Sequence, residues 1–383
     1  MRARRVCLIG QAGNVHVQRW AQALVERGLR VSLISTAPLT VPLPPALRHL
    51  PCYTIPTASP AMRPHERLLT LLRGWGRVPG LVAALRPDLV QLHALPTPAA
   101  VPFLCRVGPL VVSAWGSDVV QRDRRKSQLY PALLAHADAL TATSRYLAEV
   151  LATYLHRPRR IEVIAFGVDA ERFRPPVTRS PQLRIGTLRH LERIYGIDLL
   201  VDAIPIINDN YPNLEVVIGG AGSQQQALTA QIARLGLPDQ VRLYGRVPHA
   251  EVPAFLGALR IFAMPSRAES FGVAALEAQA CGVPVVATRV GGLPEAVVEG
   301  VSGVLVLPDD ASALAESLLR LLDDPQRAAA MGRAGRDWVR ERYDWQHNVT
   351  QMLAVYEQVV SHERPHKRSG SMAGAILPDL RVE

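Results

Sequence analysis

Long apolar runs are absent from this chain of 383 residues. A helix that spans a membrane needs roughly 18 apolar residues in a row, so a transmembrane protein is not expected. Cysteine is scarce, and its spacing matches neither a metal site nor a disulfide framework. The four cysteines are Cys7, Cys52, Cys105 and Cys281. We expect them to be reduced core residues of a cytoplasmic protein.

Aromatic residues make up only 5% of the chain, and no zinc-finger, helix-turn-helix or RNA-recognition pattern occurs. Both absences argue against a nucleic-acid partner. No Asp-x-Asp pair is present, so the sequence predicts no metal bound in that way. Residues 6–9 are apolar and follow basic residues, as in a secretion signal. That run is only about four residues long, which favours a first strand instead.

Positive charge is concentrated in the first half of the chain. Residues 1–170 hold 21 Lys+Arg against 9 Asp+Glu, and the remainder holds 22 against 24. Such a charge favours an anionic partner, either a phosphorylated substrate or an anionic membrane surface. Residues 63–77 mix leucines, arginines and Trp75, which is typical of an interfacial helix, and residues 122–126 are predicted to be a charged loop. Solvated surface is the alternative for both segments.

Short apolar strands alternate with helical segments, as in α/β proteins with parallel sheets. Strands are expected at residues 5–9, 30–35, 88–93, 109–114 and 138–143, and again at 183–188, 214–219, 240–244, 261–264, 283–287 and 303–306. We therefore predict two Rossmann-like domains, residues 1–170 and 171–345, that face each other across a cleft. Residues 346–360 are expected to form a helix that returns to the first domain, and 361–383 a flexible tail.

Two glutamates eight positions apart provide the most specific functional signal. Residues 270–272 can begin a helix that ends near Gly282, which places Glu269 before the helix and Glu277 about two turns inside it. The unpaired N–H groups at the start of such a helix can bind a diphosphate. The alternative is a solvated helix with a capping acid. The glycine-rich segment 291–295 favours a sugar-nucleotide site.

These motifs, together with glycine turns at 219–222 and 245–248, resemble the GT-B, family-4 retaining glycosyltransferases from about residue 5 to residue 355. Segment 10–20 is similar to the first loop of that family. The resemblance implies a hexosyl- or N-acetylhexosaminyl-type transferase that moves a sugar from a nucleoside-diphosphate sugar to a glycan or lipid-linked acceptor. It implies no cofactor and no metal. The implied setting is bacterial surface polysaccharide or glycolipid synthesis, in the cytoplasm and peripheral on the inner face of the cell membrane.

The resemblance also implies roles for individual residues. The first glutamate of the motif lies by the hydroxyls of the transferred sugar, and the second binds the ribose of the nucleotide; ionised carboxylates suit both tasks because they accept several strong hydrogen bonds. The implied donor-binding residues are Gly13, Gly220, Val247, Glu269, Ser270, Phe271, Gly272, Val273 and Glu277. The catalytic candidates are Glu269, Arg189, Arg193 and His93, and the acceptor-side candidates are Asn14, His16, Trp115 and Asp118. A structural role for His93 stays open.

The chain departs from the family pattern at two places. His190 and Tyr195 stand where relatives carry an Arg and a Lys that neutralise the donor diphosphate, so Arg189 or Arg193 would have to supply that cation. Trp115 stands where many relatives carry His, which removes an acid-base group but allows stacking on a sugar. Two alternatives stay open: a nonhydrolysing sugar-nucleotide epimerase, and a catalytically silent GT-B binding partner.

Overall fold

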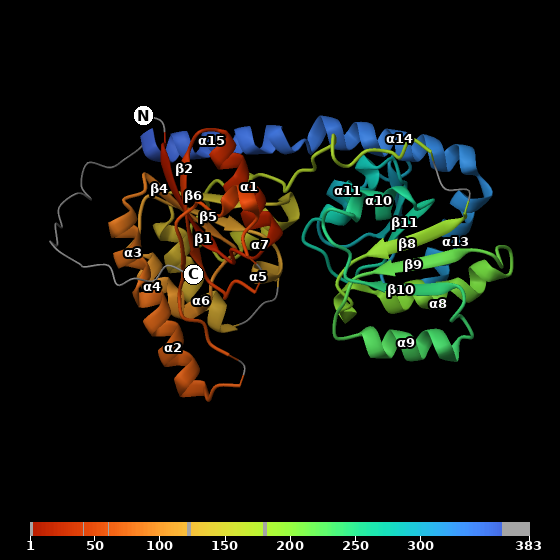
Figure 1. The fold of residues 1–383 in the computed structure, drawn as a ribbon, viewed down its shortest axis with the longest axis horizontal. Helices are drawn as coiled ribbons and strands as arrows, with labels where there is room; N and C mark the ends of the chain where they lie inside the picture. The colour runs from red at the N-terminus through yellow and green to blue at the C-terminus, as the bar shows by residue number, and fades with distance from the viewer. Residues whose placement is uncertain (1–2, 41, 60, 121–123, 179–181, 362–383) are drawn as a thin grey trace. The chain divides into compact units, whose positions relative to one another are not determined.

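The computed structural model describes residues 3–40, 42–59, 61–120, 124–178 and 182–361. The chain divides into two compact units: Met1–Ile164 with Val349–Glu383, and Ala165–Asn348. Each unit contains one sheet, in which the paired strands run parallel, with helices connecting them (Figure 1). The predicted α/β class with two Rossmann-like sheets is thus confirmed. The predicted tail, 362–383, lies outside the described residues.

The first unit holds a seven-stranded sheet in the order β3-β2-β1-β4-β5-β6-β7. Its strands are β1 (Arg5–Gly10), β2 (Arg30–Ser35), β3 (Cys52–Thr54), β4 (Leu89–His93), β5 (Leu110–Ala114), β6 (Ala139–Ala142) and β7 (Glu162–Val163). Its helices are α1 (Val15–Glu26), α2 (Pro64–Gly76), α3 (Val78–Leu85), α4 (Val101–Leu104), α5 (Ser117–Val120), α6 (Arg124–His136) and α7 (Arg145–Ala152), with short 3-10 turns η1 (Pro45–Leu47) and η2 (Pro98–Ala100).

Side chains of β4 point alternately to the two faces of this sheet. Val90 and Leu92 join the buried core with residues of α2 to α7. Gln91 points to the other face, where Tyr356 of α15 (Trp345–Ser361) donates a hydrogen bond to its Oε1. The Nε2 of Gln91 in turn donates to Ser113 Oγ at 2.8 Å. The last helix is therefore fixed to the first unit by a buried polar network.

The second unit holds a six-stranded sheet in the order β10-β9-β8-β11-β12-β13. Its strands are β8 (Arg184–Leu188), β9 (Glu215–Gly219), β10 (Val241–Gly245), β11 (Ile261–Met264), β12 (Val285–Thr288) and β13 (Gly303–Val306). Its helices are α8 (Ile197–Asn208), α9 (Gln225–Arg234), α10 (Val252–Gly257), α11 (Val273–Ala280), α12 (Leu293–Ala296), α13 (Ala311–Asp323) and α14 (Pro325–Arg342), and η3 (Arg193–Tyr195) precedes α8.

Both faces of this second sheet are buried. Val216 and Ile218 of β9 lie in a core with α8, α9 and α13, whereas Val217 between them lies in a second core with α10 and α11. Parallel strands covered on both faces read as nearly continuous apolar runs, which is why the sequence located strands such as β9 and β11. The edge strand β10 instead alternates, with Arg242 and Tyr244 exposed.

Several sequence expectations differ from the structure. The sequence missed β3 and β7, which are only three and two residues long. Residues 124–126 begin helix α6 rather than forming a loop; residues 122 and 123 lie outside the described chain. Trp75 is buried in the core of the first unit and so is no interfacial anchor.

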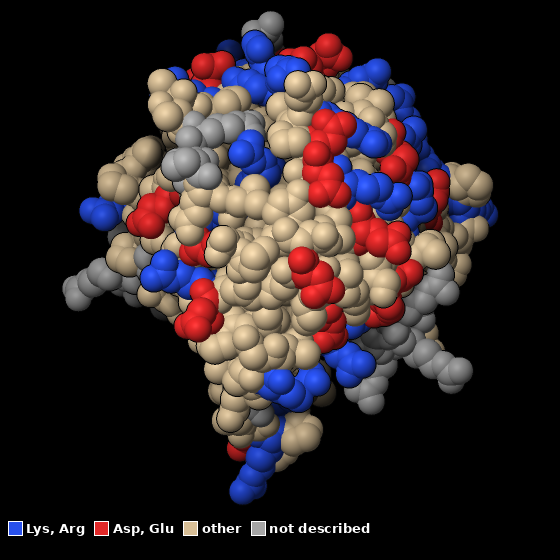
Figure 2. Space-filling model, turned by 90° about the vertical axis from the view of Figure 1, so that its right-hand side faces the viewer, with Lys and Arg blue, Asp and Glu red and all other residues tan. Residues whose placement is uncertain are grey.

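The cysteines and the surface complete this description. All four cysteines are free thiols, of which Cys7 and Cys281 are buried and Cys52 and Cys105 only partly so. No helix within the described residues is both long and apolar enough to cross a membrane. On the face shown in Figure 2, basic and acidic side chains are interspersed rather than segregated.

Candidate functional site

The predicted donor residues gather where the strand order of the second sheet reverses. β8 lies between β9 and β11, so the chain leaves β8 toward one side and returns on the other. Ligands of open α/β sheets bind outside the carboxyl ends of strands at such a point. Arg189 directly follows β8, and Glu269 lies in the loop after β11.

Arg189 and Glu269 form a partly buried ion pair at this point. Nη2 of Arg189 donates a hydrogen bond to Oε2 of Glu269, and their side chains are 13% and 10% exposed. The guanidinium also lies 4.2 Å from the centroid of the Tyr195 ring. Its Nε is buried without a hydrogen-bond partner. Tyr195 thus orients Arg189 by a cation–π contact.

Arg267 anchors the loop that carries Glu269, a role the sequence analysis missed. Its guanidinium donates to both oxygens of Asp198 at 2.8 and 2.7 Å, and to Asp309 at 2.6 Å. It also donates to the carbonyl of Arg193 at 2.8 Å. Burial opposes ionisation of Asp198, but the bonds to Arg267 prevail and lower its pKa. The feature of the sequence that could have indicated this role is the position of Arg267, two residues before Glu269.

Glycine is required where the turn after β9 approaches Arg189. Gly220 has φ +137°, and a Cβ there would lie 1.7 Å from the carbonyl oxygen of Arg189. The neighbouring Gly219 would place a Cβ 3.0 Å from Val247, the second residue after the end of β10. Gly220, Val247 and Arg189 are therefore brought close together at one end of the sheet.

Helix α11 begins at Val273, so Glu277 lies about one turn inside it rather than the predicted two. Of the eight residues of α11, only Val273 and Glu277 are not buried. They are four positions apart and so lie on one face. Gly272, at φ +110°, starts the helix where a Cβ would lie 2.6 Å from Leu293 Cδ2. Glu277 therefore lies on the one face of α11 that is not buried.

The start of α11 has amides available for a ligand. The N–H of Ser270 donates to Oε1 of Glu269 at 3.2 Å. Among the described residues, the N–H groups of 271–274 donate to no protein acceptor. Such amides and the positive end of the helix dipole attract an anion. The geometry provides amides, a guanidinium and two carboxylates within one unit.

Two residues weighed for the diphosphate cation lie differently. Arg193 and His190 are both exposed. Besides the hydrogen bonds from Arg267, the charge of Arg193 helps to lower the pKa of Asp198. The pKa of Glu192 is lowered chiefly by its hydrogen bonds from Ser223, with a smaller effect of His190. Arg189 is the candidate cation that contacts Glu269 directly.

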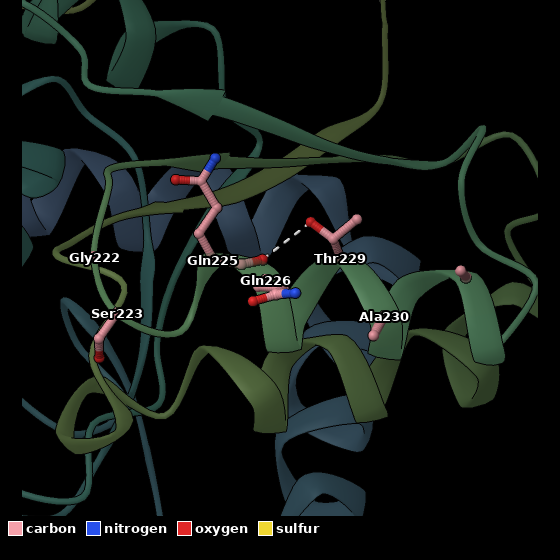
Figure 3. A pocket seen from close by; sticks show the side chains of 7 residues that line it. Gly222, Ser223, Gln225, Gln226, Thr229 and Ala230 are labelled. Carbon is pink, nitrogen blue, oxygen red and sulfur yellow. Dashed lines mark hydrogen bonds between the residues drawn. The ribbon is translucent and has the colours of Figure 1, made fainter.

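A groove beside the 219–222 turn contains none of the predicted site residues. Figure 3 shows its lining side chains, which come from one face of α9 and from Gly222 and Ser223. These side chains are small or polar and uncharged, and Thr229 donates to the carbonyl of Gln225 at 3.0 Å. The groove therefore adds no charged group to the site.

The first unit has its own reversal of strand order, between β1 and β4. His93 ends β4 against Gly10 at the end of β1, where a Cβ on Gly10 would lie 3.0 Å from His93 Cβ. The Trp115 ring lies 4.6 Å from the His93 ring and 6.1 Å from the His16 ring. Burial, with a smaller effect of His16, lowers the pKa of His93 to about 3. Three of the predicted residues thus form one aromatic cluster.

Asn14 and Asp118 both accept hydrogen bonds from nearby backbone N–H groups. Asn14 caps α1, its Oδ1 accepting from the N–H of His16 at 2.8 Å. Asp118 accepts from the N–H groups of Leu95 and Gly116 at 2.7 and 2.6 Å. Asn14 and Asp118 line a cavity of about 520 Å³ with His93 and Trp115. Gly13 is exposed, and a Cβ there would meet no atom within 4 Å.

Comparisons with known proteins bear on the same two units. The family model described as "Glycosyltransferase Family 4" matches residues 13–172, and that described as "Glycosyl transferases group 1" matches residues 169–338. The D-inositol 3-phosphate glycosyltransferase 1 of Catenulispora acidiphila is 32% identical over 93% of each chain. The chain belongs to the glycosyl transferases group 1 family.

Solved structures of glycosyltransferases have the same GT-B fold. Sucrose-phosphate synthase from Thermosynechococcus elongatus is 23% identical, with a TM-score of 0.80 over 94% of this chain and 100% of that one. HepE from Anabaena, in complex with UDP and glucose, is 21% identical, with a TM-score of 0.76 over 93% of this chain and 100% of that one. At these identities the similarity establishes the fold of this glycosyltransferase.

Proposed function

We propose that this glycosyltransferase moves a hexosyl or N-acetylhexosaminyl group from a nucleoside-diphosphate sugar to a glycan or lipid-linked acceptor, with retention at the anomeric carbon. The observation that carries the proposal is the arrangement of Arg189, Glu269 and Glu277 around the start of α11. The HepE complex with UDP and glucose supports a nucleotide-sugar donor by analogy. Synthesis of bacterial surface polysaccharide or glycolipid is the setting we infer.

The donor diphosphate would bind to the open amides at 271–274, with Arg189 supplying the cation. Glu277 would hold the ribose hydroxyls and Glu269 the hydroxyls of the transferred sugar, because a carboxylate accepts from two neighbouring hydroxyls at once. Gly220 and Val247 would border the nucleotide.

In the transfer step the bond between the anomeric carbon and the diphosphate oxygen breaks. The acceptor hydroxyl oxygen bonds to that carbon from the same face, and its proton passes to the departing diphosphate. Negative charge grows on the leaving group, so Arg189 and the amides bind it more strongly in the transition state than before. No metal is needed in this scheme; EDTA should leave turnover unchanged, and a loss restored by Mg²⁺ would contradict that part.

The experiment is product analysis with UDP-, GDP-, ADP- and TDP-sugars and a mixture of simple glycosides and glycolipids. We expect one nucleoside diphosphate to be released, in an amount equal to that of the glycoside formed. The anomeric configuration of this glycoside, determined by NMR, should match that of the donor sugar. Inverted configuration would contradict retention. Formation of an epimeric sugar nucleotide in the absence of acceptor would indicate an epimerase. Binding of a donor without any turnover would indicate a catalytically silent binding partner.

We further propose that the first unit docks on an anionic membrane surface through α2. Leu68, Leu69 and Leu72 are exposed on this helix, at 52%, 50% and 37%. The arginines of segment 63–77 are exposed around them. An apolar face with basic flanks suits the boundary of acidic headgroups and acyl chains.

Sedimentation with vesicles of neutral lipid, with and without phosphatidylglycerol, tests the docking at two salt concentrations. The protein should bind the acidic vesicles, less at high salt, and the double variant Leu68→Ser with Leu69→Ser should bind several-fold less. Val177→Ser removes an exposed apolar residue of the second unit and serves as the control. Binding that ignores lipid charge would refute this proposal.

A further inference from the structure

The cavity of the first unit has a lining with a distinct chemistry. Its volume is about 520 Å³, and it opens at the carboxyl ends of β1, β2, β4 and β5. Large apolar side chains contribute much of the wall, among them Ile55, Leu71, Trp75, Leu95 and Trp115. A flat apolar wall of this kind packs against the apolar face of a ring.

Positive charge is missing from this wall. Among the described residues that line the cavity, none is Lys or Arg, and Asp118 is the sole Asp or Glu. The carboxylate of Asp118 already accepts from the N–H groups of Leu95, Trp115 and Gly116. Among these lining residues an anionic ligand would therefore meet a carboxylate and no cation, which disfavours it.

One buried polar group in the cavity has no partner in the protein. His93 is 4% exposed, and neither its Nδ1 nor its Nε2 makes a hydrogen bond. Its lowered pKa keeps the ring neutral at physiological pH, so that one nitrogen can donate a hydrogen bond and the other can accept one. Buried polar groups are nearly always paired, and a hydroxyl can both donate to and accept from an imidazole.

We propose that this cavity binds the acceptor as an uncharged hydroxyl compound with an apolar face, its hydroxyl bonded to His93 and its apolar face against Trp115. Phosphorylated acceptors are disfavoured. The inference rests on the proposed function in treating the ligand as the acceptor. The Trp at 115, the second departure of the sequence from its family, then serves to select this class of acceptor.

The test compares two matched ligands, phenyl α-D-glucopyranoside and its 6-phosphate, by calorimetry on the full chain. We expect the uncharged glycoside to bind at least tenfold more tightly than its phosphate. Trp115→Ala should weaken glycoside binding at least tenfold, and Glu149→Gln, an exposed residue of α7, should leave it unchanged. Circular dichroism checks that each variant is folded.

A second variant adds a positive charge at the cavity and changes no core residue. Thr97 is exposed and lines the cavity, so Thr97→Lys adds a cation at the rim. The phosphate should then bind several-fold more tightly than it binds the unmodified protein. Equal or tighter binding of the phosphate by the unmodified protein would overturn the proposal, as would binding of neither ligand.

Nucleotide-sugar binding, measured on the same preparations, separates this proposal from the proposed function. Trp115→Ala and Thr97→Lys should both retain it, since Arg189, Glu269 and Glu277 lie in the second unit. Donor binding without the expected glycoside preference would refute the acceptor class alone. Glycoside binding without any donor binding would instead refute the proposed transferase.

Discussion

Arg189 donates a hydrogen bond to Glu269, although 80 positions separate them in the chain. The contact exists because β8 and β11 are neighbours in the sheet, so the residues that follow them meet at one edge. Each side chain limits the positions of the other, and the Tyr195 ring limits Arg189 further. A donor would thus find its cation and one carboxylate already in place, which lowers the cost of ordering them.

Arg189→Gln should lower kcat about 100- to 1000-fold, because one preorganised contact to developing charge contributes about 3 to 4 kcal/mol. Steady-state kinetics with the donor that turns over measures this. Arg234→Gln, an exposed arginine of α9, is the matched control and should be neutral. Activity of Arg189→Gln within twofold of the unmodified enzyme would assign the diphosphate cation elsewhere, with Arg193 next to be changed.

Gly272→Ala should destabilise the second unit by about 1 to 3 kcal/mol more than Gly300→Ala does. Both glycines have positive φ, +110° and +72°, so both substitutions strain the backbone. Only at Gly272 would the new methyl overlap a side chain, that of Leu293, whereas Gly300 faces open space. Urea unfolding measures both. Equal losses of unfolding free energy in the two variants would show that the Leu293 side chain moves away from the new methyl group without a cost in free energy.

Tyr356→Phe should reduce the stability of the first unit by about 1 to 3 kcal/mol, because it leaves the buried Oε1 of Gln91 without its donor. Tyr244→Phe, at a 45% exposed tyrosine of β10, is the control. Urea unfolding followed for each variant measures the difference. Similar stability of the two variants would mean that the network does not hold α15 in place.

His93 should make the protein acid-sensitive. Its pKa is about 3 in the folded chain and near 6.5 when unfolded, so the unfolded state binds more protons as the pH falls between these values. The free energy of unfolding should then drop by up to about 1.4 kcal/mol per pH unit below 6.5. His93→Asn keeps Asp118 and His16 and should lose less over the same range. If the free energy of unfolding fell equally with pH in the two proteins, His93 would not be buried in its neutral form.

Strand positions could be predicted well from the sequence, and side-chain contacts could not. Buried strands such as β9 and β12 read as apolar runs, whereas β3 and β7 are too short to give a pattern. The Glu269 and Glu277 motif indicated the site, but the start of α11 depends on Gly272 and its close approach to Leu293.

The remaining surprises all involve contacts between side chains. Nothing local indicates that Arg267 binds Asp198, or that Tyr195 packs under Arg189. The His93 and Trp115 contact likewise depends on the pairing of β4 with β5. The contacts of Arg267 and His93 follow from the order of strands in the sheets, and that of Tyr195 follows from the path of the chain between β8 and α8. A single sequence specifies neither.

We propose that the start of α11, with Glu269 before the helix and Glu277 inside it, holds a nucleotide sugar, and calorimetric titration of UDP-, GDP-, ADP- and TDP-sugars tests this most directly. One nucleotide family should bind, and Glu277→Ala should weaken it by roughly 10- to 150-fold, as expected for about 1.5 to 3 kcal/mol from a hydrogen bond to a charged group. Glu316→Ala, an exposed glutamate of α13, should bind as the unmodified protein does. Unchanged affinity in Glu277→Ala, or no binding of any donor, would contradict the account.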